Sequence, residues 1–106
     1  MPDIAVGHAT TPFVTAYPWT SGTGFGTKYT NPATLPPQVG NGIAFAGTAD
    51  VVVGHDTTPY ITAYPWTLGT GFGTKYTNPA TLPVDAGRGV DFAGTADIAV
   101  VHSVTP

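Results

Sequence analysis

Short alternating segments make up most of this chain, and glycine or proline interrupts each one before a helix of three turns could form. The clearest segment covers residues 60–66. One face carries large groups and the other carries small or medium apolar groups: Tyr60, Thr62, Tyr64 and Trp66 against Ile61, Ala63 and Pro65. Neither face is polar, so a sheet of such strands needs cover on both faces.

This pattern predicts four short strands per unit, named A to D. A tight turn containing Gly47 joins A to B, Pro59 breaks the run between B and C, and a glycine-rich loop at 69–73 separates C from D. The predicted ranges are 42–46 and 89–93 for strand A, 3–8, 50–55 and 97–102 for strand B, 13–19 and 60–66 for strand C, and 74–77 for strand D.

The unit repeats with a period of 47 residues, which is the spacing of Asp3, Asp50 and Asp97. Residues 3–49 and 50–96 are identical at 35 of 47 positions, and a partial third copy covers 97–106. We therefore treat 1–106 as a single repeat module. A period of this length is typical of architectures in which one unit cannot bury its apolar surface alone.

Four short antiparallel strands per repeat, apolar on both faces, favour an all-β fold of the β-propeller type with two blades in this chain. A β-solenoid is the main alternative, although its coils are usually shorter than this repeat. A flat sandwich is less favoured, because its strands would show polar alternation on the solvated face.

Two stretches of the chain resemble a known family. Residues 42–55 resemble the first two strands of a WD-repeat-like blade, and Tyr64-Pro65-Trp66 stands where that family places its Trp-Asp dipeptide, here followed by Thr67. The sequence pattern TAYPW…GFGTKYTNPATLP is similar to divergent WD-like blades of bacteriophage-type proteins. The resemblance implies blade architecture and leaves function open. The near-identity of the repeats fits a recent duplication or an engineered two-blade chain.

In blade terms the chain runs B-C-D, A-B-C-D, A-B, so we expect copies to join head to tail in a closed ring. Rings of roughly four to eight blades are usual. A dimer, trimer or tetramer is therefore possible, and we favour the homotrimer of six blades because it closes with moderate tilt. Strand B occurs three times in the chain, although two blades need only two copies. Residues 3–8 and 97–102 compete for the closing blade, and we expect 97–102 to win because a local hairpin closes at the smaller entropy cost.

Composition excludes several classes of function. Charged residues make up 8% of the 106, the net charge is −3 and no basic cluster occurs, so nucleic-acid binding is not expected. No cysteine is present, which excludes disulfides and thiolate metal sites. No apolar run could span a membrane and no signal peptide is recognised, so we expect a soluble protein of unknown location.

Histidine and aspartate invite chemical hypotheses. His8, His55 and His102 recur at the end of strand B and could form a ring of metal ligands. No second ligand stands nearby at zinc-like spacing, so we expect structural or solvated histidines. Three aspartates are interpreted as turn residues: Asp50, Asp56 and Asp97. We expect Arg88 and Asp91 to line a channel as an ion pair or as solvated charges.

Aromatic residues and the glycine-rich loop suggest ligand binding more weakly. Trp19, Trp66, Tyr17 and Tyr64 could stack on sugars, but packing between blades is the expected role. The loop at 69–73 lacks a complete phosphate-binding pattern, and its glycines are expected to allow positive φ. We predict no catalytic, cofactor or metal residue. The expected function is a non-enzymatic, self-assembling structural module whose partner is itself; a multivalent carbohydrate-binding propeller is the alternative.

Overall fold

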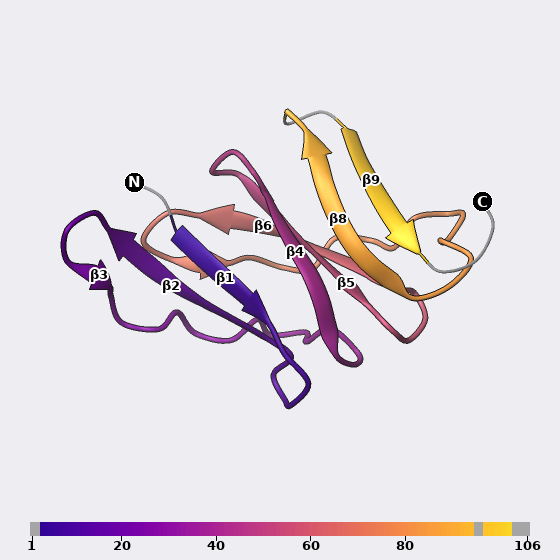
Figure 1. The fold of residues 1–106 in the computed structure, drawn as a ribbon, viewed down its shortest axis with the longest axis horizontal. Coiled ribbons are helices and arrows are strands. Elements are labelled where there is room, and N and C mark those ends of the chain that lie inside the picture. Colours follow the sequence, from indigo (N-terminus) through magenta and orange to yellow (C-terminus); the bar gives the residue numbers. More distant parts are fainter. Residues whose placement is uncertain (1–2, 95–96, 103–106) are drawn as a thin grey trace.

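Backbone pairing divides the chain into three antiparallel sheets that follow one another along the sequence (Figure 1). The computed structural model describes residues 3–94 and 97–102, and this part is all-β without a helix. Sheet 1 contains β1 (Asp3–Gly7), β2 (Val14–Thr20) and β3 (Gly24–Phe25). Sheet 2 contains β4 (Gly40–Ala46), β5 (Asp50–His55), β6 (Ile61–Thr67) and β7 (Gly71–Phe72). Sheet 3 contains β8 (Gly87–Ala93) and β9 (Asp97–His102).

The strands follow the predicted order of three, four and two, with small shifts at their ends. Strand A begins two residues earlier than expected, because a bulge between Gly40 and Gly42, and another between Gly87 and Gly89, extends its pairing with strand B. The turn at Gly47 is tight, with φ of 56° and a hydrogen bond from Ala49 N to Ala46 O. The equivalent turn at residues 95–96 lies outside the described residues.

The prediction for strand D was wrong in its position. The regular ladder with β6 involves Gly71 and Phe72, inside the predicted loop, and residues 74–77 form no regular strand. This segment still runs along β6, since Gly73 N donates to Pro65 O and Tyr76 N donates to Ala63 O. Pro65 has no N–H to donate, which limits how far a regular ladder can continue.

Sheet 2 is apolar on both faces, as the alternation predicted. Val51, Tyr64 and Trp66 pack toward sheet 1, where they meet Ala16 and other buried side chains in the main core. The intervening residues Val52, Ile61 and Ala63 belong to the opposite face, toward sheet 3. Large rings on sheet 2 thus fill the space left by small residues on sheet 1.

The connection between strands B and C has the same unusual backbone in both repeats. The Thr11–Pro12 and Thr58–Pro59 bonds are cis, and the aromatic residue that follows each has φ of 70°. This left-handed conformation is unfavourable for a bulky residue. The carbonyl oxygens of Phe13 and Tyr60 accept hydrogen bonds from His8 N and His55 N. They also lie near the start of the next strand A, where a Cβ added to Gly40 or Gly87 would be 2.5 Å from them.

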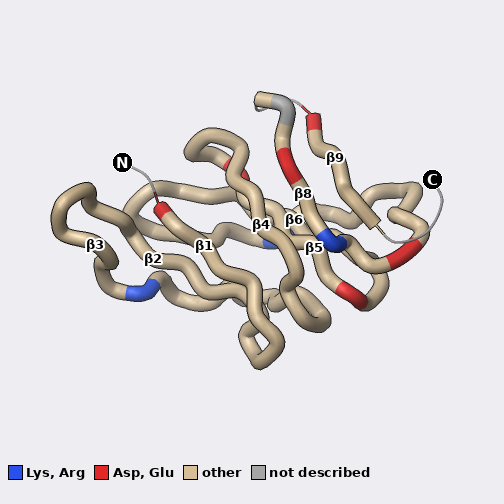
Figure 2. The backbone as a smooth tube through the Cα atoms, viewed as in Figure 1, with Lys and Arg blue, Asp and Glu red and all other residues tan. Residues whose placement is uncertain are grey.

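Charged residues are spread over all three sheets rather than gathered in one cluster (Figure 2). Among the described residues, no helix is long and apolar enough to cross a membrane.

Candidate assembly interface

The contact between sheets 1 and 2, called the filled interface below, is organised around one aspartate. Asp3 is the first residue of β1. Its Oδ2 accepts a hydrogen bond from Trp66 Nε1 at 2.9 Å, and its Oδ1 accepts one from Tyr29 OH at 3.2 Å. The Tyr29 hydroxyl in turn accepts a hydrogen bond from Gly69 N at 3.2 Å. One carboxylate therefore joins the beginning of the chain to strand C of the second repeat.

Aromatic packing surrounds this carboxylate. The indole of Trp66 makes edge-to-face contacts with Tyr29, Phe45 and Phe72, at centroid distances of 5.0, 5.1 and 5.0 Å. This geometry is favourable for aromatic rings. Because Trp66 is only 4% exposed, both its ring and its N–H are fully used inside the chain.

Burial changes the titration of two tyrosines at the filled interface. Tyr64 is fully buried and its hydroxyl donates to Thr34 O at 2.6 Å. Burial raises the pKa of Tyr64 well above its ordinary value. The pKa of Tyr29 is also raised, chiefly by burial and further by the neighbouring Asp3 carboxylate. Both hydroxyls are therefore neutral at physiological pH.

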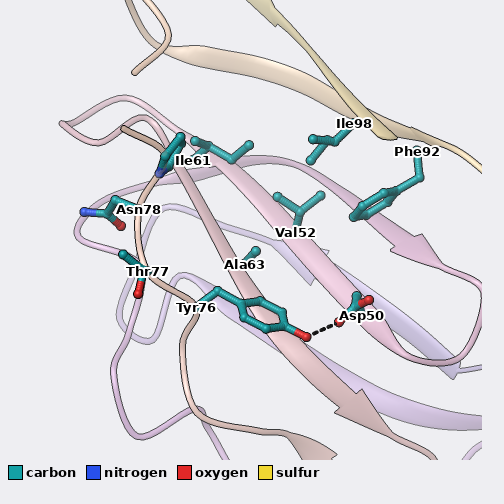
Figure 3. A pocket seen from close by; sticks show the side chains of 10 residues that line it. Asp50, Val52, Ile61, Ala63, Tyr76, Thr77, Asn78, Phe92 and Ile98 are labelled. Carbon is teal, nitrogen blue, oxygen red and sulfur yellow. Dashed lines mark hydrogen bonds between the residues drawn. The ribbon is translucent and has the colours of Figure 1, made fainter. Parts of the chain in front are cut away.

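A pocket opens on the other face of sheet 2, where sheet 3 has only two strands (Figure 3). Its volume is about 290 Å³. Asp50, Val52, Ala63 and Tyr76 come from sheet 2 and the segment after it, and Phe92 and Ile98 lie across from them on sheet 3. The remaining lining residues are Ile61, Thr77, Asn78 and Pro79.

This open pocket reproduces one half of the filled interface, displaced by one repeat. Asp50 stands where Asp3 stands, and Tyr76 stands where Tyr29 stands. Tyr76 OH donates to Asp50 Oδ1 at 2.6 Å, and this hydrogen bond is the main cause of the raised Tyr76 pKa. Among the described residues, no donor reaches the second oxygen of Asp50. Tyr76 is 47% exposed, whereas Tyr29 is 8% exposed, because the rings of a neighbouring sheet cover only Tyr29.

The other half of the filled interface recurs on the outer face of sheet 1. Tyr17, Trp19 and Phe25 are the counterparts of Tyr64, Trp66 and Phe72, and together they are called the outer aromatic face. Phe25 makes edge-to-face contacts with Tyr17 and Trp19 at 5.3 and 5.1 Å, the same arrangement as in sheet 2.

In the part of the chain that the structure describes, no sheet covers this aromatic group. Phe25 is 61% exposed, and Tyr17 and Trp19 are partly exposed. Sheet 1 has already used its other face against sheet 2. One end of the molecule therefore presents the outer aromatic face. The other end presents the open pocket, which corresponds to the site that aromatic side chains fill at the filled interface.

The histidines at the end of strand B have local partners. His8 Nε2 lies 2.7 Å from Thr15 Oγ1, and His55 Nε2 lies 2.7 Å from Thr62 Oγ1. His55 is fully buried and its Nδ1 lies 2.8 Å from Thr57 O; burial lowers its pKa. This supports the expected structural role for two of the three. Among the described residues, no group of three or more His, Asp or Glu side chains could hold a metal ion.

That Arg88 and Asp91 line a channel stays a prediction, and the structure gives their neighbours within the chain. The Arg88 guanidinium lies 4.0 Å from the Asp56 carboxylate, which also accepts Asn41 Nδ2 at 2.6 Å. Asp91 Oδ1 accepts its neighbour's N–H, from Phe92 at 2.9 Å. Asp56 lies in a bend, as predicted for a turn residue.

Asp50 and Asp97, which we interpreted as turn residues, are the first residues of β5 and β9, where the predicted strand B also begins. Asp50 is also a hydrogen-bond acceptor of the open pocket. Sequence reasoning missed this role and that of Asp3. The available signal was that an aspartate begins all three copies of strand B.

Two further sequence expectations concern the aromatic residues and the glycine-rich loop. Tyr64 and Trp66 pack between sheets, as expected. The expected packing role of Tyr17 and Trp19 remains a prediction, since they lie on the outer aromatic face. Gly69 and Gly71 have φ of 82° and 97°, which confirms the conformational role predicted for this loop.

Comparison with known proteins returned no family model, no curated protein and no solved structure that matches this chain.

Proposed function

We propose that this chain is a non-enzymatic structural module whose copies assemble head to tail into a closed β-propeller ring. The observation that carries the proposal is the pair of half-interfaces. The outer aromatic face of one copy has the residues that the open pocket of another copy lacks. In the ring, Trp19 takes the place of Trp66 and donates its indole N–H to Asp50, whose second oxygen is available.

The strands support the same arrangement. Sheet 3 contains strands A and B as β8 and β9, and sheet 1 contains strands B, C and D as β1, β2 and β3. When one of the two B strands is used, joining the sheets across two copies makes a four-stranded blade of the kind formed by sheet 2. Each chain then contributes two blades, and three chains close a ring of six.

The contact is heterologous, since different surfaces of the two copies meet. Such contacts produce a ring when the rotation closes and a fibre when it does not. Burying aromatic groups of about 150–250 Å² each supplies the driving force, because exposed apolar patches of this kind are unfavourable in water.

Native mass spectrometry of the full chain over a concentration series tests the proposal. We expect a complex with the mass of three chains. The test variant is Phe25→Ser, which removes an exposed ring of the outer aromatic face. The matched control is Leu68→Ser, which introduces the residue of the equivalent position, Ser21. Leu68 does not line the open pocket or belong to the outer aromatic face, and it lies instead in a separate cavity with Asp3 and Tyr29.

Phe25→Ser should be monomeric while Leu68→Ser assembles like the parent chain. A parent chain that stays monomeric at high concentration would refute the proposal, and so would a complex that Phe25→Ser leaves intact. A complex of two or four chains would refute the six-blade closure alone.

No observation favours the carbohydrate-binding alternative. Tyr64 and Trp66, which a sugar would have to reach in the second repeat, are buried between sheets 1 and 2.

A further inference from the structure

The chain has three copies of strand B, namely β1, β5 and β9, while a ring of two blades per chain has places for two. The copy β5 is fixed inside sheet 2. The closing blade needs either β9 of the copy that supplies β8 or β1 of the copy that supplies β2. The question of which one is used rests on the proposed ring.

A seam of glycines runs between successive sheets at one level of strand B. Gly7 of β1 faces Gly40 of β4, and a Cβ added to Gly7 would lie 2.5 Å from the Gly40 carbonyl oxygen. Gly54 of β5 faces Gly87 of β8, and its Cβ would lie 2.9 Å from the Gly87 oxygen. The atoms met are backbone, so they cannot move aside as a flexible side chain would.

Backbone contacts hold Gly40 close to the end of β1. Its N–H donates to His8 O at 3.2 Å, which ties β4 to the end of β1. A Cβ added to Gly40 would lie 2.5 Å from the Phe13 carbonyl oxygen and 3.0 Å from Gly7 Cα, so this side of Gly40 is closely packed. A strand in the B place therefore requires glycine at this level whenever another sheet follows it.

The third copy of strand B breaks this requirement. It carries Val101 where β1 has Gly7 and β5 has Gly54. Among the described residues this has no cost, because Val101 is 66% exposed and no further sheet packs beyond β9 there. In the closing blade, β9 would place the β-branched side chain of Val101 against the Gly40 backbone of the next copy.

We infer that β1, and not β9, fills the B place of the closing blade, so that β8 exchanges its hairpin partner for β1 of a second copy. This is the opposite of the outcome expected from hairpin entropy. The exchange preserves the ladder: the register that pairs Gly89 with Val101 and Val90 with Val100 pairs the same two residues with Gly7 and Val6 of the second copy. The β1 strand stays on β2, to which it is already bound.

Cysteine cross-linking in the full chain distinguishes the two outcomes, because the chain has no cysteine of its own. Directly opposed antiparallel positions have the Cα separation that a disulfide needs. The pair Val6→Cys/Val90→Cys reports β8 beside β1 of another copy, and mild oxidation should link chains end to end on a denaturing gel. The pair Val90→Cys/Val100→Cys reports the β8–β9 hairpin and links within one chain.

We expect chain-to-chain links from the first pair in the ring fraction, and loss of the hairpin link there. A ring in which the hairpin pair is fully cross-linked and the first pair is not would overturn this inference while leaving the proposed ring intact. Absence of any ring in native mass spectrometry would instead overturn the proposed function, and this inference with it.

Val101→Gly added to each cysteine pair supplies the second test. Without the clash, the local hairpin should regain the closing blade, shifting the ratio of hairpin links to chain-to-chain links by roughly tenfold or more. The control is Ala99→Gly, on the same face of β9 but away from the seam, which should leave the ratio unchanged. An unchanged ratio in Val101→Gly would also overturn the inference.

Discussion

Replacing each tryptophan by phenylalanine separates folding from assembly, because the two residues occupy equivalent positions in different surroundings. Trp66 is buried and donates to Asp3 at 2.9 Å. A hydrogen bond to a charged group contributes about 1.5–3 kcal/mol. Trp66→Phe should therefore lower the free energy of unfolding of the single chain by at least this amount. Trp19→Phe should change it by less than about 0.5 kcal/mol, as for other substitutions at partly exposed sites.

The same hydrogen bond has its counterpart between copies if Trp19 donates to Asp50 in the ring. Trp19→Phe should then raise the dissociation constant of each contact by roughly 10- to 150-fold, which corresponds to about 1.5–3 kcal/mol. Urea unfolding at low protein concentration measures the first effect, and sedimentation velocity over a dilution series measures the second.

Two results would contradict the reasoning. Equal losses of single-chain stability in both variants would mean that Trp19 is already used within the chain. An unchanged dissociation constant for Trp19→Phe would mean that the outer aromatic face does not enter the open pocket.

Three further predictions concern glycine packing and titration. Gly42→Ala should destabilise the chain by about 1–3 kcal/mol in thermal unfolding, because the added Cβ would lie 3.0 Å from Gly89 Cα. A Cβ added at Gly89 meets nothing within 4 Å in the single chain, so Gly89→Ala should weaken only the assembly. Burial lowers the pKa of His55, so the contribution of His55 to stability is complete above pH 6.5 and is lost as the pH falls from there through the folded-state pKa. His55→Gln should therefore flatten the acidic part of a plot of the urea midpoint against pH. An unchanged plot would contradict this prediction. Burial raises the pKa of Tyr64, so the opposite sign applies: stability is intact below pH 10 and falls above it, and Tyr64→Phe should remove part of that alkaline loss.

Much of the local structure could be predicted because it depends on neighbours along the chain. The alternation in residues 60–66 predicted which side chains of β6 share a face, and the packing of Tyr64 and Trp66 confirms it. Strand D was misplaced because Gly71 and Phe72 pair with β6 across a turn that needs positive φ, and a run of glycines does not indicate which of them continues the ladder.

The candidate interface depends on residues that are distant in sequence. Asp3 meets Trp66 across 63 positions, and no local pattern links them. Val101 differs from Gly7 by one substitution in an otherwise similar strand, and the sequence alone does not show that a backbone carbonyl lies where its side chain would go.

By itself, the amino-acid sequence determined the repeat, the order of its strands and the apolar character of both sheet faces, because these follow from side-chain alternation and from the turn-forming residues between strands. Only the tertiary structure decided that an aspartate joins sheets 1 and 2 and that glycines set the closest approach of neighbouring sheets. It also decided that, among the described residues, no other sheet covers the outer aromatic face or fills the open pocket. Those properties depend on how whole sheets are placed against one another, and that placement brings together atoms from separate repeats.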